Sequence, residues 1–76
     1  MAIYAEVEKV YESDQEVRYK FMGAEGVERV VVLDKMARRT RFDGGVEHNQ
    51  YLAVASKVAV TWGRDGVAPD RLIVAS

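Results

Sequence analysis

The stretch from Glu16 to Met22 reads Glu-Val-Arg-Tyr-Lys-Phe-Met, and its alternation decides the fold. Apolar Val17, Tyr19 and Phe21 occupy every second position, and charged side chains stand at most of the positions between them. Successive side chains of a β-strand point to opposite faces of its sheet. This period of two therefore predicts a half-buried strand with one apolar face and one mostly charged face.

A second strand is predicted before this one, over residues 3–11. Ile3, Ala5, Val7 and Tyr11 can share one face of it. The intervening segment from Glu12 to Gln15 reads Glu-Ser-Asp-Gln, and such side chains favour turns because they bond to nearby main-chain groups. The two strands should therefore form a hairpin.

The register of this hairpin follows from the facing side chains, because a slip of one residue would send every side chain to the other face. A loop centred on Asp14 sets apolar residues against apolar ones and an acid against a base. It pairs Tyr11 with Val17, Val7 with Phe21, and Glu8 with Lys20. Centring the loop between Ser13 and Asp14 would instead set Glu8 against Tyr19, so we expect the loop of odd length.

Two further segments after this hairpin have strand character. Gly23-Ala24-Glu25-Gly26 predicts a turn whose glycines accept positive φ. Residues 27–35 contain Val-Val-Val-Leu in succession at 30–33, which is too apolar for a strand with one solvated face. This third strand should be central, or covered on both sides. The segment Arg38 to Asp43 is either a fourth strand, with Thr40 and Phe42 on one face, or an irregular basic loop.

The period changes after Gly44-Gly45, and an amphipathic helix is predicted. Its apolar stripe comprises Tyr51, Leu52, Val54, Ala55, Val58, Ala59 and Trp62. Gly44 fits the N-cap with Glu47 three positions on, and Gly63 fits the left-handed residue that often ends a helix. Residues 71–75, Arg-Leu-Ile-Val-Ala, then predict a last strand.

The predicted fold is α+β, in one small domain over residues 1–76. It is an antiparallel β-meander of three to four strands, with one amphipathic helix packed on one face and a short C-terminal strand. The expected core consists of Val17, Tyr19, Phe21, Val30, Val32, Leu52, Ala55, Val58 and Trp62.

Composition narrows the classes of protein to which the chain can belong. Hydrophobic residues make up 49% of it, as in folded globular proteins, and it has no cysteine for disulfides or thiolate metal sites. It shows neither a basic leader followed by an apolar run nor an apolar stretch long enough to span a bilayer. We expect a cytoplasmic protein that is not inserted in a membrane.

Positive charge is concentrated in one place. Four cations lie within the eight residues from Lys35 to Phe42, in a chain with a formal net charge of −1. Such a cluster creates a local field that attracts an anionic partner, and arginine forks suit carboxylate or phosphate. The candidate binding residues are Lys35, Arg38, Arg39, Arg41 and Phe42.

Three interpretations of this cluster remain open. The charges can be structural, paired with the acids of residues 1–16, which number five against one cation. They can bind a protein partner with an acidic surface. They can bind nucleic acid, for which a pI near 5.8 is unfavourable. The leading functional hypothesis is a non-enzymatic module that binds an acidic macromolecular partner, with nucleic-acid binding as the alternative.

The sequence indicates no catalytic site, metal or cofactor. His48 is the only histidine, and a metal site normally needs three or four converging ligands. A third possibility is a small-ligand binder or enzyme at a dimer interface around His48. A homodimer is itself a reasonable expectation, because Leu72-Ile73-Val74 has no charge after Arg71 that would protect it at a sheet edge.

Overall fold

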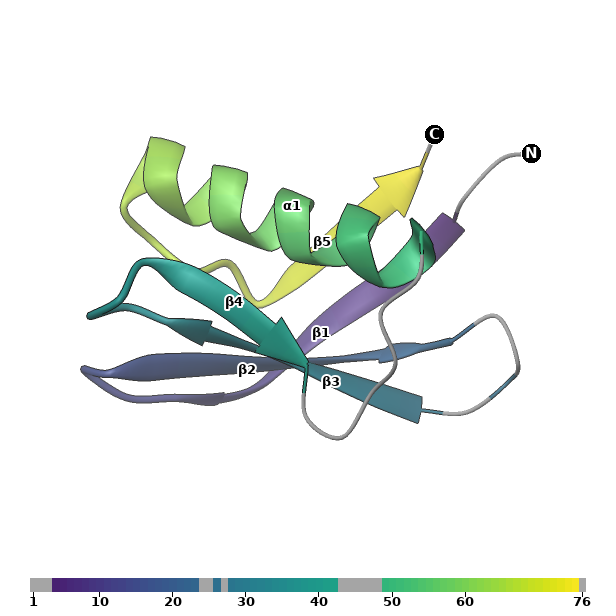
Figure 1. The fold of residues 1–76 in the computed structure, drawn as a ribbon, viewed down its shortest axis with the longest axis horizontal. Coiled ribbons are helices and arrows are strands. Elements are labelled where there is room, and N and C mark those ends of the chain that lie inside the picture. The colour runs from purple at the N-terminus through teal and green to yellow at the C-terminus, as the bar shows by residue number, and fades with distance from the viewer. Residues whose placement is uncertain (1–3, 24–25, 27, 43–48, 76) are drawn as a thin grey trace.

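The computed structural model describes residues 4–23, 26, 28–42 and 49–75, and contains one antiparallel sheet with one helix across a face of it (Figure 1). The elements are β1 (Tyr4–Glu12), β2 (Glu16–Met22), β3 (Glu28–Asp34), β4 (Arg39–Phe42), α1 (Asn49–Asp65) and β5 (Arg71–Ala75). The strand order is β4-β3-β2-β1-β5. The predicted α+β fold is confirmed, and the segment left open as strand or loop contains strand β4.

Several predicted positions lie outside the described residues. They are Ile3, Ala24, Glu25, Val27, Asp43, Gly44, Gly45, Glu47 and His48.

The β1–β2 hairpin has the predicted register over most of its length and a bulge near its turn. Val7 faces Phe21 and Glu8 faces Lys20, as expected, but the register shifts between Lys9 and Tyr11. Beyond the shift Tyr11 faces Arg18 rather than Val17, so that predicted pair is wrong. The bulge inserts one extra residue into β1, which leaves a two-residue loop closed by the Ser13 N–H donating to the Glu16 carbonyl at 2.8 Å.

The third strand, β3, lies between β2 and β4 and buries apolar side chains on both of its faces, but in the opposite phase to the predicted one. Val31 and Leu33 pack in the core under α1, whereas Val30 is only half-buried. Val32 is buried on the other face of the sheet, where its cross-strand neighbours are Arg18 and Arg41. Four consecutive apolar residues have no period of two, so they do not reveal which alternate pair faces the helix.

The helix α1 buries a narrower stripe than the sequence predicts. Tyr51, Val54, Ala55 and Val58 are buried against the sheet, and Trp62 packs at the margin of this core, only partly buried. Leu52, predicted to lie in the core, is 52% exposed. Leu52 stands about 100° around the helix from Tyr51, and the predicted apolar stripe is wider than the part of the helix surface that one sheet face covers.

The helix ends at a different glycine from the predicted one. It continues through Gly63 to Asp65, and Gly66, with φ of 70°, is the left-handed residue. The Gly66 N–H donates to the Trp62 carbonyl at 2.8 Å, which satisfies one main-chain acceptor of the last turn. The prediction for Gly63 is therefore wrong by one turn.

The loop between α1 and β5 is fastened to the hairpin by two side chains. The Tyr19 hydroxyl donates to the Pro69 carbonyl at 2.7 Å, and Lys9 Nζ donates to the Ala68 carbonyl at 3.1 Å. Lys9 Nζ also lies 3.1 Å from Asp70 Oδ1. These contacts direct the chain from the helix back to β1, against which β5 then pairs.

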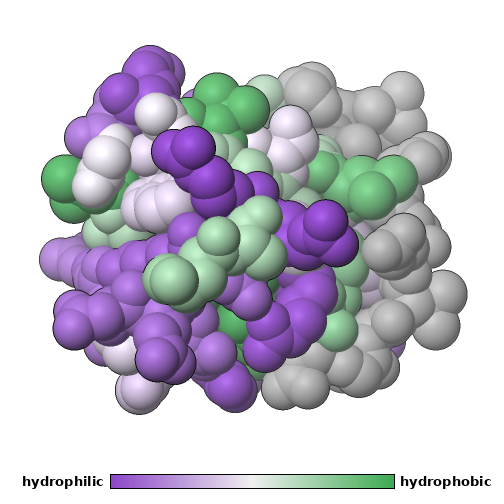
Figure 2. Space-filling view, turned by 60° about the vertical axis from the view of Figure 1, so that its left-hand side comes forward, coloured by the Kyte–Doolittle hydropathy of each residue, from purple (hydrophilic) through white to green (hydrophobic). Residues whose placement is uncertain are grey.

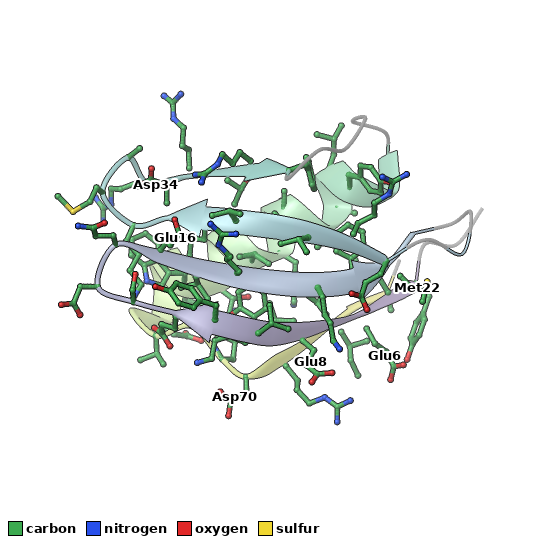
Figure 3. All side chains as sticks on the ribbon, turned by 90° about the horizontal axis from the view of Figure 1, so that it is seen from below. Glu6, Glu8, Glu16, Met22, Asp34 and Asp70 are labelled. Carbon is green, nitrogen blue, oxygen red and sulfur yellow. The ribbon has the colours of Figure 1, made fainter. Side chains whose placement is uncertain are left out.

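The second face of the sheet has no helix over it in the described structure, and we call it the open face (Figure 3). The register assigns alternating acids and bases to it. Its charged residues are Glu6, Glu8, Glu16, Glu28 and Asp34 together with Arg18, Lys20, Arg39, Arg41 and Arg71.

Candidate functional site

The predicted basic cluster begins in the turn between β3 and β4. Asp34 Oδ1 accepts hydrogen bonds at 2.9 Å from the main-chain N–H groups of both Met36 and Ala37. An aspartate that bonds to the main chain two and three residues ahead stabilises a tight turn. Arg38 follows with φ of 57°, a left-handed conformation that is unusual for a residue with a Cβ. The turn therefore fixes where the arginine side chains leave the main chain.

Lys35 is held by the neighbouring hairpin. Its Nζ lies 3.0 Å from Glu12 Oε2 and donates at 2.8 Å to the Ser13 carbonyl. Its main-chain N–H donates to the Gln15 carbonyl at 2.9 Å. Its side chain is 20% exposed, so Lys35 joins the ends of β1, β2 and β3 and offers little of its charge to a partner.

Glu12 is the acceptor for two lysines. Its other oxygen, Oε1, lies 2.7 Å from Lys9 Nζ. Hydrogen bonds donated by Lys9 and then by Lys35 lower the pKa of the Glu12 carboxyl, and the hydrogen bonds that Lys9 donates to Glu12 and then to Asp70 raise the pKa of Lys9. For Lys35 this cluster of one acid between two bases agrees with the structural interpretation, in which the basic residues pair with the acids of residues 1–16.

Arg39 and Arg41 leave the open face of β4, which is a border strand of the sheet. Both are exposed, and the Arg41 side chain is 55% exposed. Arg41 Nη2 lies 3.8 Å from Glu16 Oε1, at the long end of the range for an ion pair, while Glu16 Oε2 accepts from Arg18 Nε. A long ion pair with a solvated guanidinium contributes about 0 to 1 kcal/mol, so Arg41 can exchange this contact at little cost.

Arg38 and Phe42 lie toward the helix side of β4. The Arg38 guanidinium stands 5.9 Å from the centre of the Trp62 ring, within range of a cation–π contact. Phe42 is half-buried and packs on Tyr51, with ring centres 5.1 Å apart. Phe42 is therefore part of the core margin.

Three of the predicted binding residues thus lie on or next to β4, Arg39 and Arg41 on its open face and Arg38 toward the helix, and we call these three residues the arginine patch. Lys35 and Phe42, the other two predicted binding residues, are engaged in an ion-pair cluster and in the core. Figure 2 shows the end of the molecule where the β1–β2 and β3–β4 turns lie, and hydrophilic side chains predominate on that surface.

A second surface feature was missed from the sequence. A broad hollow of about 910 Å³, open to solvent, lies at the opposite end of the sheet from the β3–β4 turn and includes Tyr4, Glu6, Met22 and Ile73 in its lining. Its described lining contains no residue of the arginine patch. The signal was present in the sequence as apolar residues at open-face positions, but it required the order of the strands to show that they gather.

Other kinds of site find no support among the described residues. No three His, Cys, Asp or Glu side chains converge there as a metal site. The possibility built on His48 falls outside the described part of the chain. Of the segments that the structure describes, α1 is the single helix, and it is not long and apolar enough to cross a membrane.

Comparisons of the chain with protein-family models, with curated proteins and with solved structures gave no match.

Proposed function

We propose that this chain is a small non-enzymatic interaction module of the cytoplasm that binds an acidic protein partner through the arginine patch. The observation that supports it best is the exposure of Arg39 and Arg41 on one face of a border strand. Guanidinium groups bind carboxylates with two parallel hydrogen bonds, which favours them at contacts between proteins.

The spacing of the two arginines suits carboxylates on an extended segment. Residues two apart on a strand lie about 7 Å apart on the same face. An acidic partner with carboxylates at alternate positions would match this spacing. The open-face acids Glu16 and Asp34 lie beside the arginines. A partner whose carboxylates are placed individually can avoid these acids, whereas the continuous charge of a nucleic-acid backbone cannot.

The test compares two variants that lose the same charge. Arg39→Ala with Arg41→Ala removes the two open-face arginines. Lys57→Ala with Arg64→Ala removes two exposed cations of α1 and is the matched control. We expect nuclease-treated native lysate to yield the same captured protein with the intact chain and with the control. The Arg39 and Arg41 variant should lose that protein, and its recovery by all three chains would contradict the proposal.

Nucleic-acid binding is distinguished by its dependence on salt. A chain that neutralises phosphates binds random duplex DNA or RNA with an affinity that falls steeply as salt rises. We expect no such binding near physiological salt. Salt-sensitive binding that is lost with Arg39 and Arg41, combined with capture that disappears after nuclease treatment, would overturn the protein partner in favour of nucleic acid.

A further inference from the structure

The two borders of the sheet are protected to different degrees. β4 has four residues, two of which are exposed arginines, and charged side chains on a short strand hinder pairing with another chain. β5, at the opposite border in Figure 3, has one cation, Arg71, followed by four apolar residues. In the described structure no strand lies beyond β5, so its outer main-chain groups are available.

The hydrogen bonds already made identify those groups. The Lys9 N–H donates to the Asp70 carbonyl at 2.8 Å, which marks residues 9 and 70 as a hydrogen-bonded pair. Hydrogen-bonded pairs alternate along an antiparallel ladder, so Val7 with Leu72 and Ala5 with Val74 are the next ones. The amide and carbonyl groups of Arg71, Ile73 and Ala75 therefore point away from β1.

Exposed apolar side chains lie on this border strand and on the two strands before it in the sheet. On the open face Ile73 is 57% exposed, Tyr4 59% and Met22 55%, and all three line the hollow. Ile73 of β5 stands across from Glu6 of β1. Strand β1 separates β5 from β2, which contains Met22. Large apolar residues gathered at an unpaired strand mark a surface of interaction.

We propose that β5 pairs with β5 of a second copy of this chain, antiparallel about a two-fold axis at Ile73. The burial of β5 alternates exposed and buried symmetrically about Ile73, so the strand is complementary to itself. This register sets Ile73 against Ile73, Leu72 against Val74, and Arg71 against Ala75. In this register the amide and carbonyl groups of Arg71, Ile73 and Ala75 that point away from β1 all form hydrogen bonds with the second copy.

Charge and size also agree with this register. Arg71 is the only charged residue of β5 and faces Ala75 of the other copy, so no like charges stand directly opposite each other. The small Ala75 side chain leaves room for the Arg71 stem to lie across it toward Tyr4, which neighbours Ala75 in β1. The closed two-fold arrangement removes two unprotected borders at once. It does not involve the arginine patch and is independent of the proposed function.

The first test is the mass of the chain in solution as a function of concentration. We expect sedimentation equilibrium to show a mass that rises from 8.5 kDa toward twice that value. Ile73→Lys sets two cations against each other at the axis and should weaken association by more than about tenfold. Val60→Lys, at a residue 58% exposed on α1, makes the same change elsewhere and should leave association intact.

The second test does not depend on tolerance of a lysine in β5. Hydrogen-bonded antiparallel residues have Cα atoms about 5.5 Å apart, within the range that a disulfide spans. The natural chain has no cysteine, so Ile73→Cys introduces a single thiol. Mild oxidation should convert this variant to a covalent dimer and leave Val60→Cys largely monomeric. A chain that stays monomeric at high concentration, or Ile73→Cys and Val60→Cys variants that crosslink equally, would overturn the proposed interface.

Discussion

Tyr19 connects the hairpin to the loop that precedes β5, and it does so from within the core. Its ring is 1% exposed and its hydroxyl donates to the Pro69 carbonyl at 2.7 Å. Burial, which disfavours the charged phenolate, raises the pKa of Tyr19 to about 12 from the ordinary 10.0. A neutral hydroxyl in this position therefore helps to hold the C-terminal strand in place.

This arrangement predicts a loss of stability in alkaline solution. The Tyr19 pKa is raised in the folded chain, so the unfolded chain releases the proton first as pH rises above 10. The stabilisation is complete below pH 10 and should be lost as pH rises through about 12, at a cost of roughly 2 to 3 kcal/mol. Urea denaturation at a series of pH values measures it. The pKa of Lys9 is also raised in the folded chain, so deprotonation of Lys9 also lowers stability as pH rises, and part of the loss of stability in alkaline solution comes from Lys9.

Tyr19→Phe separates the two contributions. The variant keeps the ring and loses the hydrogen bond to Pro69, which should lower stability near neutral pH by about 1 to 2 kcal/mol. Its decline between pH 10 and 12 should be shallower than that of the natural chain. Equal declines in the two proteins would show that Tyr19 does not titrate as described.

The ion pair of Lys35 could not be predicted from the residues around it in the sequence. The charge of Lys35 and its place in a run of basic residues made it a reasonable binding residue, but its partner Glu12 is 23 positions away. Only the pairing of β2 with both β1 and β3 brings them together. The assignment of Phe42 to the same strand face as Thr40 was sound, whereas the helix residue that covers it, Tyr51, could not be inferred from local pattern.

At the level of elements, the period of the sequence predicted the strands and the helix, and local ambiguity caused the errors. The bulge in β1 reconciles a hairpin centred on Asp14 with a two-residue loop, and a facing-pair argument without a bulge cannot find it. The unbroken apolar run of β3 concealed its phase. Gly63 and Gly66 both satisfy the pattern of a helix end, and only the positive φ of Gly66 and its hydrogen bond to Trp62 distinguish them.

The two glycines give opposite predictions for the end of α1. Gly63 has ordinary helical backbone, and a Cβ there would meet nothing within 4 Å, so Gly63→Ala should stabilise the chain by about 0.5 to 1 kcal/mol. Gly66 has φ of 70°, so Gly66→Ala should destabilise it by about 1 kcal/mol. Denaturation midpoints measure both changes. The reverse pair of signs would place the helix end at Gly63.

The whole molecule depends on a strand order that places β1 in contact with both β2 and β5. In this order Glu8 stands on the open face between Lys20 of β2 and Arg71 of β5. Neither local periodicity nor charge composition could predict that a C-terminal strand would border the first one. A charge reversal at Glu8 therefore tests the architecture directly.

Glu8→Lys should create a row of three like charges across three strands. Like charges directly opposite each other destabilise a sheet, and we expect a loss of roughly 1 kcal/mol beyond that of Glu28→Lys. Glu28→Lys changes the net charge by the same amount, but residue 28 stands across from the uncharged Met22, so this variant is the matched control. Urea denaturation in dilute buffer and again in about 1 M salt should show the difference shrinking as the repulsion is screened. If the two variants lose equal stability at both salt concentrations, then Glu8 is not flanked by Lys20 and Arg71, and β5 does not lie beside β1.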